Sequence, residues 1–221
     1  MGPGAADNTN FIIRAFQEGG LPVMGTIAVI LILALIIIVD RFMKMRNLIV
    51  DKKEFTDQLF RMVVAGDLRQ AISFCDSRPA PLTNTVKAGL IQAMNKRPDE
   101  EIQVAMDAAV MREIPKVEGK VPFLAVFGNV AVLAGLLGTI IGMIGAFRGV
   151  IAEDPAQKAK ILAEGISHAL NCTAFGLTVA IICIVSYGWF QFQIQKTENE
   201  VIESSMTLMN LVASNRDKMK D

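Results

Sequence analysis

Two threonines within apolar stretches are the residues whose type and position could support ion chemistry. Thr139 lies in NVAVLAGLLGTIIGMIGAF (129–147), and Thr173 lies in GISHALNCTAFGLTVAIICIVSYGWF (165–190). A hydroxyl inside a membrane helix can bond to a backbone carbonyl and do nothing else, or it can line a wet path for an ion. The residues alone leave both interpretations open.

His168 is the only histidine of the chain, and no Asp or Glu occurs inside either stretch. A proton relay through a membrane needs a group that titrates there. An imidazole titrates near physiological pH and could serve. However, His168 lies only about one helical turn inside its stretch, where a hydrogen-bonded structural role is the alternative. Either the chain carries no ions, or a partner supplies the acid.

Small residues recur in both stretches at steps of three and four, which places them on one face of a helix. In lipid the backbone must satisfy its own hydrogen bonds, so a glycine-rich stretch stays helical and its small-residue face lets another helix approach closely. We therefore expect two membrane helices packed through these faces. The candidate packing and pore-lining residues are Gly135, Gly138, Gly142 and Gly145 in the first stretch, and Ala169, Gly176 and Ala180 in the second, where the small-residue face also includes Thr173 and Cys183.

The two threonines are expected at the same depth if one helix runs outward and the next runs inward. Thr139 lies eight residues before Phe147, and Thr173 lies eight residues after Gly165. At about 1.5 Å of rise per residue, both would lie roughly 12 Å below the outer end. They could then form one polar ring where the helices meet.

The composition is that of a membrane protein without an obvious catalytic apparatus. The chain has 221 residues, 52% of them hydrophobic, and a mean hydropathy of +0.42. Lys+Arg and Asp+Glu are equal at 22 each, so the net charge suggests no nucleic-acid partner. Three unpaired-looking cysteines and a single histidine offer no metal site, and no phosphate loop or dinucleotide motif is present. We therefore expect that the chain is not an enzyme and that it binds no metal and no cofactor.

The order of apolar and charged segments predicts an all-α integral membrane protein with three membrane helices. Basic residues after the first apolar run, from Arg41 to Lys53, place that side in the cytoplasm and the N-terminus in the periplasm. The expected segments are a short periplasmic or interfacial N-terminus (1–20), a first membrane helix (21–40), a cytoplasmic helical domain (41–120), a second membrane helix (121–147), a periplasmic loop (148–160), a third membrane helix (161–192) and a cytoplasmic helical tail (193–221) that extends the third helix.

Capping residues indicate where helices begin inside the expected cytoplasmic domain. Asp67 is expected to cap a helix that runs through Cys75, and Thr83 or Asn84 is expected to cap the next helix. The scattered acidic residues of this domain have the spacing of a solvated face.

Two motifs carry a resemblance to a known family. They are GLLGT (135–139) and GISHALNCTAFGL (165–177), the second similar to the family pattern GIAEALxxTAxGL. With the linker GDLRQAISFCDSRPAPL (66–82), they resemble the TolQ/ExbB/MotA proton-channel family, and its TolQ/ExbB branch most. The resemblance covers nearly the whole chain from about residue 10.

The resemblance implies a motor or stator subunit of the bacterial inner membrane. Family members form a homopentamer around the membrane helices of a dimeric, single-span TolR/ExbD-type partner, and each partner helix brings one aspartate. Proton flow then drives force across the periplasm, for uptake, envelope maintenance or motility. Thr139 and Thr173 match the family's pore threonines. His168 stands where this branch usually has glutamate, and Val132 where the family often has proline.

Two other functions compete with this one. A helical membrane scaffold that conducts nothing would use the same glycine faces. A small-molecule transporter is less favoured, because the sequence shows no inverted repeat and no broken membrane helix. The ion is a proton by resemblance, although threonine oxygens can also coordinate sodium.

Overall fold

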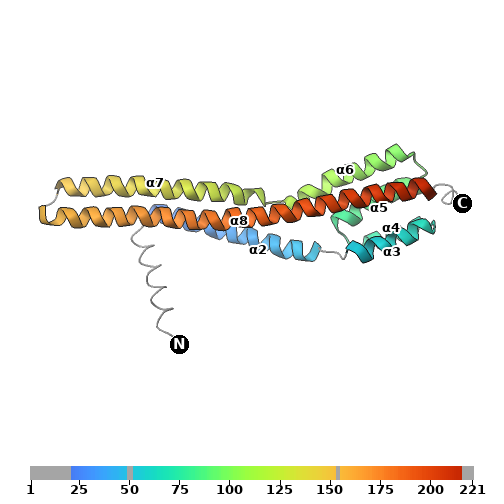
Figure 1. Cartoon of the computed structure of the whole chain (residues 1–221), viewed down its shortest axis with the longest axis horizontal. Coiled ribbons are helices and arrows are strands. Elements are labelled where there is room, and N and C mark those ends of the chain that lie inside the picture. Colours follow the sequence, from blue (N-terminus) through green and yellow to red (C-terminus); the bar gives the residue numbers. More distant parts are fainter. Residues whose placement is uncertain (1–20, 49–51, 153–154, 216–221) are drawn as a thin grey trace, which may run out of the picture. The chain divides into compact units, whose positions relative to one another are not determined.

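The computed structural model describes residues 21–48, 52–152 and 155–215, and within them all regular structure is helical (Figure 1). The predicted all-α class is confirmed. The expected N-terminal segment 1–20 lies outside the described residues. The helices are α2 (Leu21–Leu48), α3 (Lys52–Val64), α4 (Leu68–Ser77), α5 (Pro81–Met94), α6 (Asp99–Glu118), α7 (Pro122–Ala152) and α8 (Pro155–Asn215).

Three runs of helix are long and apolar enough to cross a membrane, so the chain is a multi-pass membrane protein. They are Pro22–Met45, Asp99–Ile151 and Gln157–Ser214, with mean hydropathies of 3.0, 2.3 and 2.0 in their most apolar windows. The second run joins α6 to α7. Its membrane part is α7, which has no charged residue before Arg148, whereas α6 opens with three acidic residues. The side of the membrane that each segment faces stays a prediction.

The predicted loop 148–160 is largely helical. α7 continues to Ala152, and α8 begins at Pro155. The predicted second membrane helix stops before the first charge, Arg148, but a charge ends an apolar run without ending a helix. Proline is favoured at the first position of a helix, where its fixed φ fits and its missing N–H costs nothing.

The described residues divide into two compact units. The membrane unit combines residues 21–39 of α2 with residues 120–188, which hold α7 and the first half of α8. The extramembrane unit combines residues 40–119 with the second half of α8 from Trp189. α2 and α8 therefore each contribute to both units.

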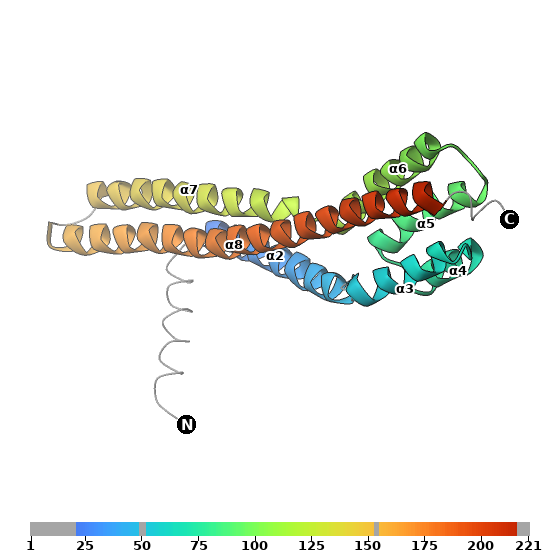
Figure 2. The same cartoon turned by 45° about the vertical axis from the view of Figure 1, so that its right-hand side comes forward.

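The extramembrane unit has a conventional hydrophobic core. Phe55 stacks on Phe74 at 5.0 Å between ring centroids, and Leu208 of α8 is fully buried among residues of α3 to α6. Within this unit the last part of α8 runs between α6 and the α3–α4 pair (Figures 1 and 2). Burial raises the pKa of the Cys75 thiol in this core to about 12, with the nearby Asp76 acting in the same direction. The thiol is therefore protonated and inert at neutral pH.

Caps fix the starts of the helices in this unit, and one differs from the prediction. Asp67 caps α4 as predicted, because its carboxylate accepts a 3.1 Å hydrogen bond from the Gln70 amide. The prediction for α5 was wrong. That helix begins at Pro81, so Thr83 lies inside its first turn, where its hydroxyl accepts a 2.8 Å hydrogen bond from the Ala80 amide.

Candidate ion pathway in the membrane unit

Small residues form the contact between α7 and α8 and bring the backbones of the two helices close together. The two helices lie side by side and antiparallel in the membrane unit (Figure 1). A Cβ added to Gly176 would lie 2.6 Å from the Ala131 carbonyl oxygen, and one added to Gly135 would lie 3.0 Å from the Cys172 carbonyl oxygen. Gly176 has no room for a side chain, and Gly135 would accept one only if the neighbouring backbone shifted. The glycines are thus what allows the two backbones to meet.

The predicted packing residues divide between the helix contact and its edge. Gly142 packs its bare Cα beside the imidazole of His168, with 3.1 Å between the built Cβ position and Nδ1. Gly145 is exposed, and a Cβ there would meet nothing within 4 Å. The buried members of the set are Gly135, Gly138, Ala169, Gly176 and Ala180.

Two residues outside the predicted packing set also belong to the α7–α8 contact, whereas Gly145 does not. Ala146 is buried, and a Cβ added to Gly165 would overlap it. Cys172 is also buried, and a Cβ added to Gly138 would lie 2.7 Å from its Cβ. A strict 3.6-residue period carried along both helices would have pointed to Ala146 and Cys172, although neither belongs to the glycine pattern.

The two threonines lie at nearly the same level of the α7–α8 pair. Gly138 faces Cys172 and Gly142 faces Ala169, so the antiparallel register sets Thr139 level with about residue 171. That is about two residues, or roughly 3 Å along the axis, from Thr173. The geometry agrees with the equal depth expected from the sequence.

The two hydroxyls have different partners. Thr139 donates a 2.6 Å hydrogen bond to the Leu136 carbonyl of its own helix. Thr173 reaches across the contact to the Gly135 carbonyl at 3.4 Å, which is a long hydrogen bond. Gly135 has no side chain to block this approach. A long bond to a carbonyl that already serves its helix is easily exchanged for a better acceptor.

A groove of about 890 Å³ adjoins this level and opens between α2, α7 and α8. Pro22 and Val23 border it from α2, and Gly138 and Gly142 border it from α7. His168 lines it from α8, half-buried, and its Nδ1 is buried with no hydrogen-bond partner. An unpaired imidazole nitrogen beside a groove can hold a water or a proton.

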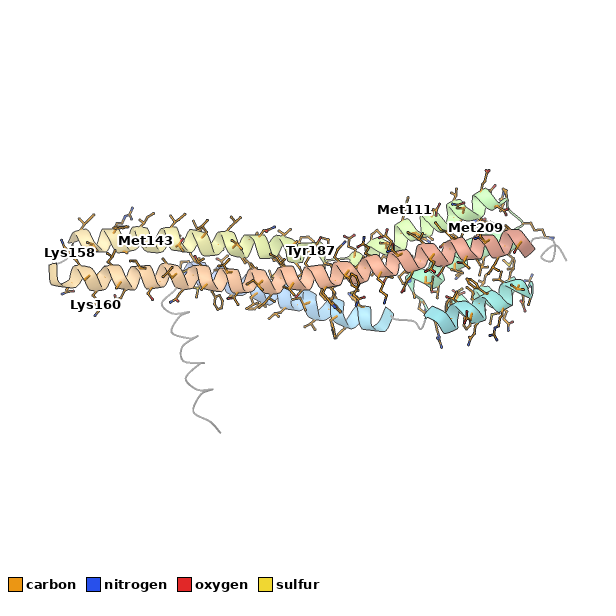
Figure 3. The ribbon with its side chains drawn as sticks, in the orientation of Figure 1. Met111, Met143, Lys158, Lys160, Tyr187 and Met209 are labelled. Carbon is orange, nitrogen blue, oxygen red and sulfur yellow. The ribbon has the colours of Figure 1, made fainter. Side chains whose placement is uncertain are left out.

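The charged groups of this part of α8 lie toward its N-terminal end. Glu164 is exposed and lies 3.9 Å from the ammonium of Lys160, and it lines the same groove. Lys158 and Lys160 belong to the first turns of α8 (Figure 3). Among the described residues, no group of His, Cys, Asp and Glu side chains is arranged to hold a metal ion.

Comparison with known proteins decides the family. The model of the MotA/TolQ/ExbB proton channel family matches residues 77–203, more than half of the 221 residues. The chain belongs to this family. The match includes both threonines, the whole of α7 and the first half of α8, so the resemblance inferred from the two motifs is confirmed.

Individual relatives come from the TolQ and ExbB proteins. The Tol-Pal system protein TolQ of Pseudomonas aeruginosa is 40% identical over 91 residues, which are 41% of this chain and 39% of that protein. TolQ of Haemophilus influenzae is 35% identical over 96 residues, 43% of this chain and 42% of that protein. The biopolymer transport protein ExbB of Pseudomonas putida is 35% identical over 94 residues, 42% of this chain and 28% of that protein. The chain thus aligns with less than half the length of these relatives.

Proposed function

We propose that the chain is a subunit of an inner-membrane motor that converts a proton gradient into mechanical force through a TolR/ExbD-type partner. The observation that carries this proposal is the threonine pair. Two hydroxyls, Thr139 and Thr173, lie at one level of two closely packed membrane helices, and the apolar stretches around them (129–147 and 165–190) contain no carboxylate. Hydroxyls can solvate a proton carrier and cannot replace it, so the acid comes from another chain.

The partner's acid would be an aspartate on a single membrane helix. A carboxylate that loses its proton inside a membrane is costly unless polar groups surround it. The Thr173 hydroxyl can leave its long bond to the Gly135 carbonyl and donate to the carboxylate, and Thr139 can do the same from α7. The groove beside Gly138, with His168 on its wall, would deliver protons to this level. Protonation then removes the charge and releases the partner helix to move.

The resemblance to the family implies that the assembly is a pentamer of this chain around a partner dimer. Its N-terminus would face the periplasm and its C-terminus the cytoplasm, in keeping with the basic residues that follow the first membrane helix. The process driven would be the class served by the relatives, a Tol-Pal system or biopolymer transport.

Native mass spectrometry of the gently extracted protein tests the assembly. We expect five copies of this chain with two copies of a small single-span protein. A complex without such a protein would favour the alternative function, a scaffold in which both threonines only bond to backbone carbonyls.

Thr173→Val tests the conduction step, because valine keeps the shape and removes the hydroxyl. We expect proton flux into proteoliposomes that hold the whole complex to fall at least tenfold, about 1.4 kcal/mol or more in barrier height, with the assembly intact. The matched control is Thr178→Val on the same helix. Thr178 is exposed and bonds only to the Ala174 carbonyl, at 2.8 Å, so its loss should leave flux unchanged. Normal flux in Thr173→Val would refute the conduction role.

A further inference from the structure

A second cavity lies wholly within the extramembrane unit and does not touch the threonines. Its volume is about 430 Å³, and it is formed where the end of α2, the start of α5 and the end of α6 meet. Three cationic side chains line it, Arg41, Lys44 and Lys116, and one carboxylate, Glu113. Nothing in the proton pathway requires these residues.

Arg41 is a buried positive charge in the wall of this cavity. Its side chain is 9% exposed. Nη1 donates to the carbonyls of Lys116 at 3.4 Å and Val117 at 3.3 Å, in the last turn of α6. Gly119, which ends α6 with φ +48°, has no room for a side chain because a Cβ there would overlap the guanidinium. Nε is buried, lies 3.5 Å from Asp40 and donates no hydrogen bond.

The carboxylates near the cavity are already engaged. Glu113 accepts hydrogen bonds from Lys116 Nζ at 2.7 Å and Asn84 Nδ2 at 3.1 Å. Burial raises the pKa of this carboxyl, but the two hydrogen bonds and the charges of Lys116 and Arg112 outweigh that effect and hold the pKa below its ordinary value. Asp40 bonds to Lys44 at 2.9 Å. Three cations against these two carboxylates leave an excess of one positive charge.

The N-terminus of α5 adds positive potential to the same cavity. This helix has 14 residues and begins at Pro81, with Ala80 in the cap position, where its amide donates a hydrogen bond to the Thr83 hydroxyl. Ala80 and Pro81 both line the cavity. The positive end of the α5 dipole therefore adjoins the cavity and favours an anion there. The N-terminal end of α5 and the buried Arg41 therefore favour the same type of ligand.

The cations that line the cavity lie close in sequence to the ends of two membrane helices. Arg41 and Lys44 follow the apolar run of α2 within about one turn, and Lys116 precedes the first residue of α7, Pro122, by six residues. Met45 and Val117 supply apolar walls beside the charges. A cavity with cationic and apolar walls next to the end of a membrane helix matches a lipid headgroup and the first part of its glycerol.

We propose that this cavity binds the phosphate group of an anionic phospholipid headgroup. Arg41 and the α5 N-terminus provide the fixed part of the site. Lys44 and Lys116 are 58% and 62% exposed and can swing toward the phosphate. The proposal is independent of the motor function, since it concerns neither the threonines nor the partner.

The test uses native mass spectrometry of the intact complex in mild detergent, titrated separately with phosphatidylglycerol and with phosphatidylcholine of the same acyl chains. We expect phosphatidylglycerol to be retained on each copy of this chain at concentrations where phosphatidylcholine is not. The double variant Lys44→Gln/Lys116→Gln should weaken phosphatidylglycerol retention by roughly tenfold or more. The matched control is Lys87→Gln, which breaks a comparable surface ion pair with Asp76 outside the cavity and should change nothing.

Glu113→Gln gives a second readout, with the opposite sign. It removes the one carboxylate that lines the cavity, while the amide keeps the size of the side chain and one of its two acceptor oxygens, so phosphatidylglycerol retention should rise several-fold. A purely structural role for the cluster would not tighten binding. Equal retention of both lipids, or no change in the double variant and in Glu113→Gln, would overturn the proposal.

A separate arm distinguishes a lipid from a soluble phosphate. Inorganic phosphate at millimolar concentration should not displace phosphatidylglycerol, because the apolar walls hold only the lipid. Full displacement by inorganic phosphate would mean that the cavity binds a phosphate group but that the ligand is not a lipid.

Discussion

The α7–α8 contact in the membrane unit and the core of the extramembrane unit are packed in opposite ways. Between α7 and α8, Gly176 lies against the Ala131 carbonyl and Gly135 against the Cys172 carbonyl. In the extramembrane core, Phe55, Leu59 and Leu208 are each exposed by 1% or less. Lipid tails are as apolar as leucine, so large side chains gain little by leaving them, and association there depends on close contact of backbones. In water the gain comes from apolar area removed from solvent.

Phe55→Ala, in the core of the extramembrane unit, should have the largest effect on stability. The ring is 1% exposed and stacked on Phe74, so its loss should lower the free energy of unfolding by about 3–5 kcal/mol. A guanidinium titration followed by the fluorescence of Trp189, the only tryptophan, measures it, since that indole packs on Phe190 in the same unit at 5.0 Å. Val104→Ala is the control. Val104 is 66% exposed, so the effect there should stay within about 0.5 kcal/mol.

Gly176→Ala tests the backbone contact between α7 and α8 in the membrane unit. One added methyl group would lie 2.6 Å from the Ala131 carbonyl oxygen, so α7 and α8 must separate, at a cost of about 1–3 kcal/mol. An SDS titration in mixed micelles, followed by circular dichroism, measures the change. Gly145→Ala adds the same methyl group on α7 where nothing lies within 4 Å and should be neutral or slightly stabilising. Equal effects of the two substitutions would mean that backbone contact does not hold these helices together.

The smallest expected effect is electrostatic and belongs to the extramembrane unit alone. Because the pKa of Glu113 is lowered in the folded chain, its ionised form contributes stability at neutral pH. That contribution is lost as the pH falls below about 4.5, the ordinary value, and through the lowered folded value. Thermal unfolding of the chain and of Glu113→Gln at pH 7 and at pH 4 or below measures it. The difference between the two proteins should shrink in acid, and a constant difference would contradict the assignment.

The sequence was a good guide wherever one residue type served one local purpose. Asp67 could be placed as a cap because a carboxylate satisfies the first amides of a helix in almost any context. The glycine face of α7 could be placed because its spacing fixes its direction. The level of Thr139 relative to Thr173 also followed, since helical rise is nearly constant.

What could not be predicted depended on contacts between segments. Gly145 continues the glycine spacing but leaves the contact, because Ala146 lies closer to the axis between α7 and α8. α5 begins at Pro81, ahead of the polar residues that were expected to cap it, since proline preorganises the first turn. The pairing of Arg41 with the end of α6 joins residues about 75 positions apart, a separation that no local pattern encodes.

The burial of all three cysteines makes the chain suited to site-selective chemical labelling. Cys172 and Cys183 lie within the α7–α8 contact, and Cys75 lies in the extramembrane core. Burial raises the pKa of the Cys75 thiol to about 12, so this thiol stays protonated at pH 7. A maleimide should therefore leave the native chain largely unmodified. It should react fully with Met111→Cys, whose position on α6 is 78% exposed (Figure 3), so one fluorophore could be attached without removing any native cysteine.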